Sequence, residues 1–193
     1  MTLSEFLQTQ PQESIRLLSF ARDEKGDFRF RLEGSTRFEV TLKGVSEAEI
    51  LFERGQKELF RLEESLEDAL LWDYGQFYEI YGDAPVADPI KFFFDFLQGV
   101  RFDLKLARDP ARYLNWKKDY KEWVNFTYQR AYHLMTAPKP LTDLATKILD
   151  AQAIEHNVLT GPDLSDDKQR SAVWIGPSWF VVEEAEVKLA SSS

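Results

Sequence analysis

The sequence predicts an α+β fold, in which an antiparallel β-meander of four to six strands packs against three or four helices. Three observations lead to this prediction. Apolar and charged residues alternate through most of residues 15–62, which is typical of strands with one buried face. Two Asp-Pro pairs each precede apolar residues at helical spacing. A C-terminal segment rich in β-prone residues is expected to return to the sheet.

The expected meander follows a short N-terminal helix over residues 2–10, which Pro11 ends. Polar, glycine-containing turns separate the strand candidates along the chain. One face of the meander is apolar and the other is charged, so we expect another layer to cover the apolar face. The strand candidates are residues 15–20, 28–32, 38–42, 48–52 and 59–62.

The covering layer is expected from the segment that follows the meander. Residues 65–81 fit a helical stripe only if Asp73 and Tyr74 lie within it, and Gly75 weakens a helix further. We therefore favour a helix only slightly over a strand or irregular loop through residues 72–78.

Three further helices are predicted after this ambiguous stretch. Asp88-Pro89 begins a helix that Gly99 can end, and residues 102–107 are expected to form a short strand. The second Asp-Pro pair, at 109–110, begins the longest expected helix, which ends before Pro138. Another helix opens at Pro140 and places the apolar residues of 141–158 on its buried side.

The C-terminal part is predicted to contain a loop and a β segment. Residues 159–171 are mostly polar and are expected to form a loop. Gly176-Pro177 then interrupts two β-prone runs, 173–175 and 179–182. This spacing predicts either a hairpin or one strand bent at the Gly-Pro pair.

Length and composition favour one domain with three regions. These are a mainly β meander over 1–64, a mainly helical part over 65–160, and a loop with a C-terminal β segment over 161–190. The net charge of −9 and the pI of about 4.9 argue against nucleic acid and anionic membranes as partners. Because the chain has no Cys, no secretory leader pattern and no long apolar stretch, we expect a cytoplasmic protein.

No sequence motif indicates catalysis, a metal or a cofactor. The glycine-rich phosphate loops are absent, and Ser178 has no evident base beside it. His133 and His156 belong to no metal-binding motif, so a zinc site would need the fold to bring them together. The Asp residues within 163–167 do not follow the EF-hand spacing. We therefore expect no cofactor, no metal and no catalytic residue.

The candidate binding residues come from the aromatic-rich stretch 70–85 and from the longest expected helix. In the first of these, carboxylates alternate with aromatic rings. Such a carboxylate either has a raised pKa in a cleft or accepts hydrogen bonds from Tyr hydroxyls, and we favour the second interpretation. The candidates are Trp72, Asp73, Tyr74, Tyr78, Glu79, Tyr81, Trp116 and Trp123.

Two classes of function are compatible with these features. The first is a non-catalytic acidic domain that binds another protein with a basic surface, as an inhibitor, immunity-type antagonist or assembly factor would. Its support is the acidic charge together with Trp and Tyr residues, which commonly anchor interfaces. The alternative is a small-molecule-binding domain, which could be an enzyme, with an aromatic pocket between sheet and helices. Exposed rings rimmed by acids favour the first class, and a closed cavity holding Asp73 or Glu79 favours the second.

Overall fold

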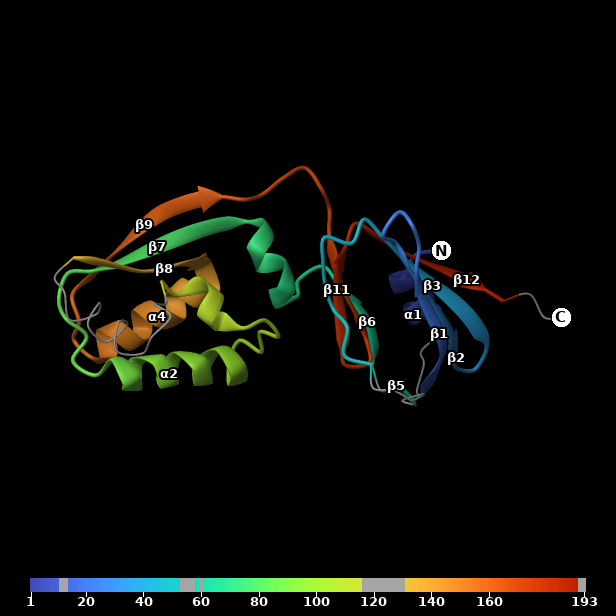
Figure 1. The fold of residues 1–193 in the computed structure, drawn as a ribbon, viewed down its shortest axis with the longest axis horizontal. Coiled ribbons are helices and arrows are strands. Elements are labelled where there is room, and N and C mark those ends of the chain that lie inside the picture. Colours follow the sequence, from blue (N-terminus) through green and yellow to red (C-terminus); the bar gives the residue numbers. More distant parts are fainter. Residues whose placement is uncertain (11–13, 53–57, 60, 116–130, 191–193) are drawn as a thin grey trace. The chain divides into compact units, whose positions relative to one another are not determined.

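The chain forms a mixed α+β structure with antiparallel sheets, as the sequence predicts (Figure 1). The computed structural model describes residues 1–10, 14–52, 58–59, 61–115 and 131–190. The chain divides into two compact units. Unit 1 comprises Met1–Leu71 together with Asp167–Ser193, and unit 2 comprises Trp72–Asp166. Unit 2 is therefore inserted in the sequence of unit 1.

Unit 1 contains two antiparallel sheets, whose strand orders are β12-β3-β2-β1-β5 and β4-β11-β10-β6. Consecutive pairing of β1, β2 and β3 confirms the start of the predicted meander. Its elements are α1 (Leu3–Thr9), β1 (Ile15–Arg22), β2 (Phe28–Glu33), β3 (Arg37–Lys43), β4 (Glu47–Glu49), β5 (Glu58–Leu59), β6 (Leu62–Ser65), β10 (Ser171–Ile175), β11 (Ser178–Val182) and β12 (Glu184–Leu189).

The alternating apolar residues of the meander form much of the core of unit 1. Phe28 and Phe30 of β2 both pack on Phe180 of β11, with ring centroids 5.4 Å apart in each pair. Strand β4 leaves the meander and pairs with β11 instead of β3. The sequence predicts that the later helices cover the apolar face of the meander. In the structure, the second sheet and α1 contribute the buried side chains on that face instead.

Both ends of unit 1 follow the sequence signals closely. Thr2 caps α1, because its side chain accepts the Glu5 N–H while the Glu5 carboxylate accepts the Thr2 N–H. Strands β10 and β11 form the hairpin, with Gly176 at φ 58° in the turn, so the hairpin alternative is correct. Strand β12 pairs with β3, which confirms that the C-terminal β segment returns to the sheet.

Unit 2 contains a sheet of order β8-β7-β9 and helices that cover it. Helix α4 packs against β7 and β8, and α2 packs against α4 (Figure 1). Phe92 and Phe96 of α2 are fully buried, as is Ile80 of β7. Its elements are η1 (Ala69–Tyr74, which begins in unit 1), β7 (Gln76–Gly82), α2 (Pro89–Phe102), η2 (Pro110–Tyr113), β8 (Tyr132–Pro138), α4 (Lys139–Ala151) and β9 (His156–Asp163).

The favoured helix over residues 65–81 is wrong. The segment contains a short 3-10 helix, η1, followed by strand β7, so the strand alternative is correct. Aromatic and β-branched residues such as Phe77 and Ile80 fit a pleated surface between two neighbouring strands, and pairing on both sides overrides the weak helical stripe.

The longest expected helix is also wrong at its C-terminal end, since residues 132–138 form β8. Ala131, at φ 57°, has a left-handed backbone that no helix continues through. The Asp-Pro start itself is correct, because Asp109 caps the 3-10 helix η2. Residues 116–130, which carry Trp116 and Trp123, lie outside the described residues.

The remaining differences are at element ends. Helix α2 continues through Gly99 to Phe102, so the predicted stop and the strand over 102–107 are both wrong. Gly99 instead allows close packing, since a Cβ there would lie 2.7 Å from a methyl carbon of Leu144. Residues 156–163, expected partly as helix and partly as loop, form strand β9 along β7.

Candidate functional site

The structure separates the predicted binding residues into two described groups. Trp72, Asp73 and Tyr74 belong to η1, whereas Tyr78, Glu79 and Tyr81 belong to β7. Within β7, Glu79 and Tyr81 point to one side of the sheet. Tyr78, one residue away, points to the α4 side. Trp116 and Trp123 lie outside the described residues, so the predicted aromatic pocket between sheet and helices stays a prediction.

Asp73 is the centre of a largely buried ion cluster. Its carboxylate lies 3.3 Å from Arg108 and 3.5 Å from Arg112, and it accepts a hydrogen bond from the Tyr113 hydroxyl. The side chains of Asp73 and Arg108 are 11% and 2% exposed. Burial, together with the bond to Asp73, raises the pKa of the Tyr113 hydroxyl well above its usual range. This cluster ties η1 to η2.

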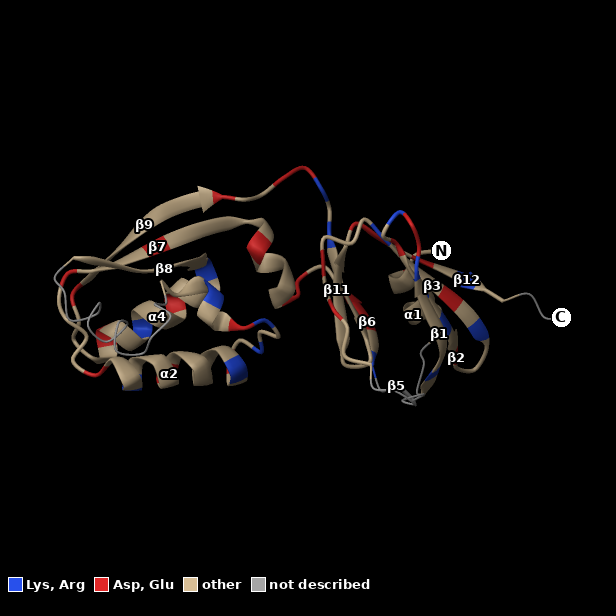
Figure 2. Ribbon diagram, in the orientation of Figure 1, with Lys and Arg blue, Asp and Glu red and all other residues tan. Residues whose placement is uncertain are grey.

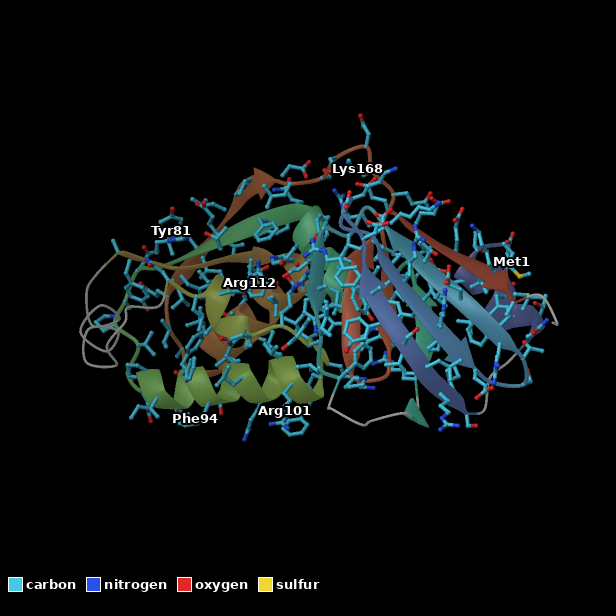
Figure 3. The ribbon with its side chains drawn as sticks, turned by 45° about the vertical axis from the view of Figure 1, so that its right-hand side comes forward. Met1, Tyr81, Phe94, Arg101, Arg112 and Lys168 are labelled. Atoms are coloured by element: carbon cyan, nitrogen blue, oxygen red, sulfur yellow. The ribbon has the colours of Figure 1, made fainter. Side chains whose placement is uncertain are left out.

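Glu79 and Tyr81 form part of a polar, aromatic surface that we call the Tyr81 face. It consists of Glu79, Tyr81, His133, Thr136 and Leu159. Cross-strand pairing places Glu79 between Thr136 and Leu159, and it places Tyr81 opposite His133. All five side chains are partly or largely accessible. In Figure 3, Tyr81 lies on the side of the sheet away from α2. The labels Phe94 and Arg101 mark α2 in that view.

Direct contacts connect the polar members of the Tyr81 face. The Tyr81 hydroxyl donates to the Glu79 carboxylate at 3.0 Å, and this bond raises the pKa of the Tyr81 hydroxyl. The Tyr81 and His133 rings have centroids 4.9 Å apart. His133 Nε2 and Thr136 Oγ1 are hydrogen bonded at 2.9 Å. The resulting chain of contacts holds an aromatic pair in one orientation at the surface, which suits recognition.

Strand β9 borders the Tyr81 face and ends the sheet. It pairs with β7 on one side, and among the described strands none pairs with its other side. Val158 and Leu159 are 45% and 53% exposed, so both faces of this strand are accessible. The Gln76 side-chain amide donates to the carbonyls of Gly161 and Pro162 at 2.8 and 3.2 Å, which fixes the far end of β9.

Unit 1 contains a second aromatic cluster, around Trp174 and Trp179. These residues lie opposite each other on β10 and β11. Their indole N–H groups donate to Asp68 at 2.9 Å and to Glu49 at 2.8 Å, and Arg61 stacks 3.9 Å from the Trp174 ring centroid. Trp179 is only 5% exposed. Because carboxylates of the same unit already satisfy both indoles, this cluster is chiefly structural.

A groove of about 520 Å³ lies between α2 and α4. Apolar side chains of Phe102, Leu144 and Ile148 line it, together with Lys91 and Asp95, which pair with each other. At its edge the buried side-chain amide of Gln152 makes no hydrogen bond within the described residues. Neither Asp73 nor Glu79 lines this groove, so it differs from the pocket that the sequence predicts.

Charge is spread over both units, with acidic residues at several loops and strand ends (Figure 2). Within the described ranges, no group of three or more His, Asp or Glu side chains is arranged to hold a metal ion. None of the described helices has the length and hydropathy needed to cross a bilayer.

Comparison of the chain with protein-family models, with curated proteins and with solved structures gave no match.

Sequence reasoning missed several residues of these surfaces. His133 was expected near the end of a helix, and only the pairing of β8 with β7 brings it beside Tyr81. No local pattern marks Arg108 or Leu159, because a cluster or sheet face is assembled from distant segments of the chain. The one available signal for β9 was its Val158-Leu159-Thr160 run, which is β-prone but is followed by Gly-Pro.

Proposed function

We propose that this chain is a non-catalytic, acidic, cytoplasmic protein-binding domain that acts as an inhibitor, an immunity-type antagonist or an assembly factor. The observation that supports this proposal is the Tyr81 face, in which hydrogen bonds orient an accessible Tyr–His pair beside the exposed Leu159. Oriented aromatic side chains next to an apolar one are typical anchors of protein interfaces, because little side-chain freedom is lost on binding.

The charge of the chain favours a basic partner. The net charge is −9, and Glu79 lies within the Tyr81 face itself. Opposite charge on a partner would accelerate association and would make binding weaken as salt is added. The Glu79 carboxylate accepts the Tyr81 hydroxyl hydrogen bond, which raises the pKa of that hydroxyl and orients the ring for recognition.

Affinity capture with matched variants tests this function. The tagged chain, Tyr81→Ala and Phe94→Ala are used to capture proteins from native cell extract at low and high salt, followed by mass spectrometry. Phe94 is the control, because it is an aromatic residue of α2 that is 58% exposed. We expect one stoichiometric basic partner that high salt releases, and about a 30-fold loss of affinity for Tyr81→Ala alone. Equal binding by all three forms would contradict the role of this face.

A second candidate function, binding of a small molecule, is favoured by the groove between α2 and α4. Its apolar lining and the unpartnered Gln152 amide would suit a ligand that offers both a donor and an acceptor. The capture experiment separates the two functions. Repeated recovery of the chain alone would count against protein binding, and metabolites would then be screened by thermal shift against the chain and Gln152→Leu.

A further inference from the structure

Strand β9 presents an open backbone edge with a defined pattern. The Asp83 N–H bonds the Glu155 carbonyl, where the pairing of β7 with β9 begins. Along an antiparallel pair of strands, hydrogen-bonded residue pairs alternate with pairs that are not hydrogen bonded. Every second residue after Glu155, namely 157 and 159, therefore also directs its N–H and C=O groups to β7. The same groups of His156, Val158 and Thr160 therefore point away from the sheet, ready to pair with another strand.

The middle of this edge lacks the usual devices that prevent pairing. Residues 157–161 read Asn-Val-Leu-Thr-Gly and contain no charged side chain and no proline. Natural edge strands commonly carry lysine, proline or a bulge that blocks the approach of another chain. In β9 the proline, Pro162, and the register shift beside it come only at the end of the strand. The strand is also fixed in place, since Gln76 bonds two of its carbonyls.

The surroundings of β9 select the charge of an incoming strand. Glu155 precedes the strand, Asp163 ends it and Asp166 follows, while no Lys or Arg occurs from 148 to 166. Figure 2 shows this acidic segment after the β9 arrow, with no basic residue on the strand itself. Glu79 adds a carboxylate on the neighbouring strand, opposite Leu159. A segment carrying Lys or Arg would be attracted to both ends of this edge.

We propose that β9 binds an extended, basic segment of the partner protein, which adds to the sheet as a fourth strand. This inference rests on the proposed function and specifies how the partner is held. Main-chain hydrogen bonds to Val158 and its outward-facing neighbours provide affinity. Side chains of the added strand that lie on the Tyr81 side contact Leu159, and basic side chains at its ends meet Glu155 and Asp163.

A model peptide tests strand addition without knowledge of the partner. The probe is an acetylated and amidated octapeptide that alternates lysine and valine, added to the full chain, with amide hydrogen exchange as the readout. At a peptide concentration ten times its dissociation constant, we expect about tenfold slower exchange at the outward amides of Val158 and Thr160. Two control peptides are the same sequence N-methylated at alternate residues and one that alternates glutamate with valine. Neither should protect these amides.

Two variants at one position test the backbone contact directly. Val158→Pro removes an outward N–H, which an edge strand tolerates without loss of its sheet pairing. Val158→Thr keeps that N–H with a β-branched side chain. We expect the proline variant to lose peptide protection and to bind the captured partner at least tenfold more weakly, and the threonine variant to behave like the parent chain.

The outcomes separate this inference from the proposed function. Loss of partner binding for Tyr81→Ala, with none for Val158→Pro, would overturn strand addition and leave the binding function intact. Absence of protection by the lysine–valine peptide at millimolar concentration would likewise overturn it. Equal protection by the glutamate–valine peptide would overturn the basic character of the segment. If no partner is captured but the peptide protects Val158, the open edge is established and the proposed function fails.

Discussion

At the scale of single residues, the position of a carboxylate in the fold decides what it can do. Asp73 and Glu79 both accept a hydrogen bond from a Tyr hydroxyl, and they are six positions apart in the sequence. Asp73 is nearly buried among cations, which makes it a structural group. Glu79 remains accessible beside Tyr81, where it can meet a partner. Sequence alone treats the two as equivalent members of one aromatic stretch.

The buried ion cluster leads to a prediction about stability. Asp73→Asn keeps the shape of the side chain but leaves Arg108 without the opposing charge of the carboxylate. We expect the free energy of unfolding, measured by urea titration, to fall by about 3 kcal/mol, because the carboxylate charge that offsets the burial of Arg108 is removed. The matched control is Asp143→Asn. Asp143 forms a salt bridge with Lys139, and both side chains are more than 60% exposed. We expect the control to leave stability essentially unchanged, because solvent screens an exposed ion pair. Similar effects for both variants would show that the cluster is not stabilised by its charges.

At the scale of elements, alternation predicts strands well only where one face is buried and the other faces water. Strand β2 alternates in this way and lies close to its predicted bounds. In strand β8 the register shifts beside Leu134 and Met135, so two consecutive buried residues interrupt the alternation and the apolar run resembles a helical stripe. Strand β9 is accessible on both faces and therefore resembles a loop. The Tyr81 face depends on the registers in which β8 and β9 pair with β7, and no local sequence pattern encodes these registers.

The pairing of β7 with β8 leads to a prediction at this scale. Gly82 faces Tyr132, and a Cβ at position 82 would overlap the Tyr132 ring. That ring cannot move aside easily, because Tyr132 is 2% exposed and its hydroxyl donates to the Ala84 carbonyl. We expect Gly82→Ala to destabilise the chain by about 2 kcal/mol in urea titration, as overpacking does. Gly75→Ala is the control, since the nearest atom to its Cβ would lie 3.8 Å away. A neutral Gly82→Ala would mean that β7 and β8 separate readily.

At the scale of the whole molecule, the question is whether two compact units unfold as one. Each unit has its own buried residues, exemplified by Phe180 in unit 1 and Phe96 in unit 2. The chain passes between them twice, after Leu71 and after Asp166. The first passage lies inside η1, so a single helical segment belongs to both units. Because η1 spans the boundary, the single domain predicted from the sequence stays a prediction that unfolding of the full chain can test.

Cooperative unfolding of the full chain tests that prediction. Pulsed hydrogen exchange at increasing urea concentrations would follow residues 28–43 as a probe of unit 1 and residues 132–149 as a probe of unit 2. If the chain is one domain, both probes lose protection at the same urea concentration, and Gly82→Ala, a substitution in unit 2, lowers that concentration for both. A lower midpoint for residues 132–149 alone would show instead that unit 2 unfolds by itself. The Tyr81 face and the β9 edge would then belong to an independently folding module, because all of their residues lie in unit 2.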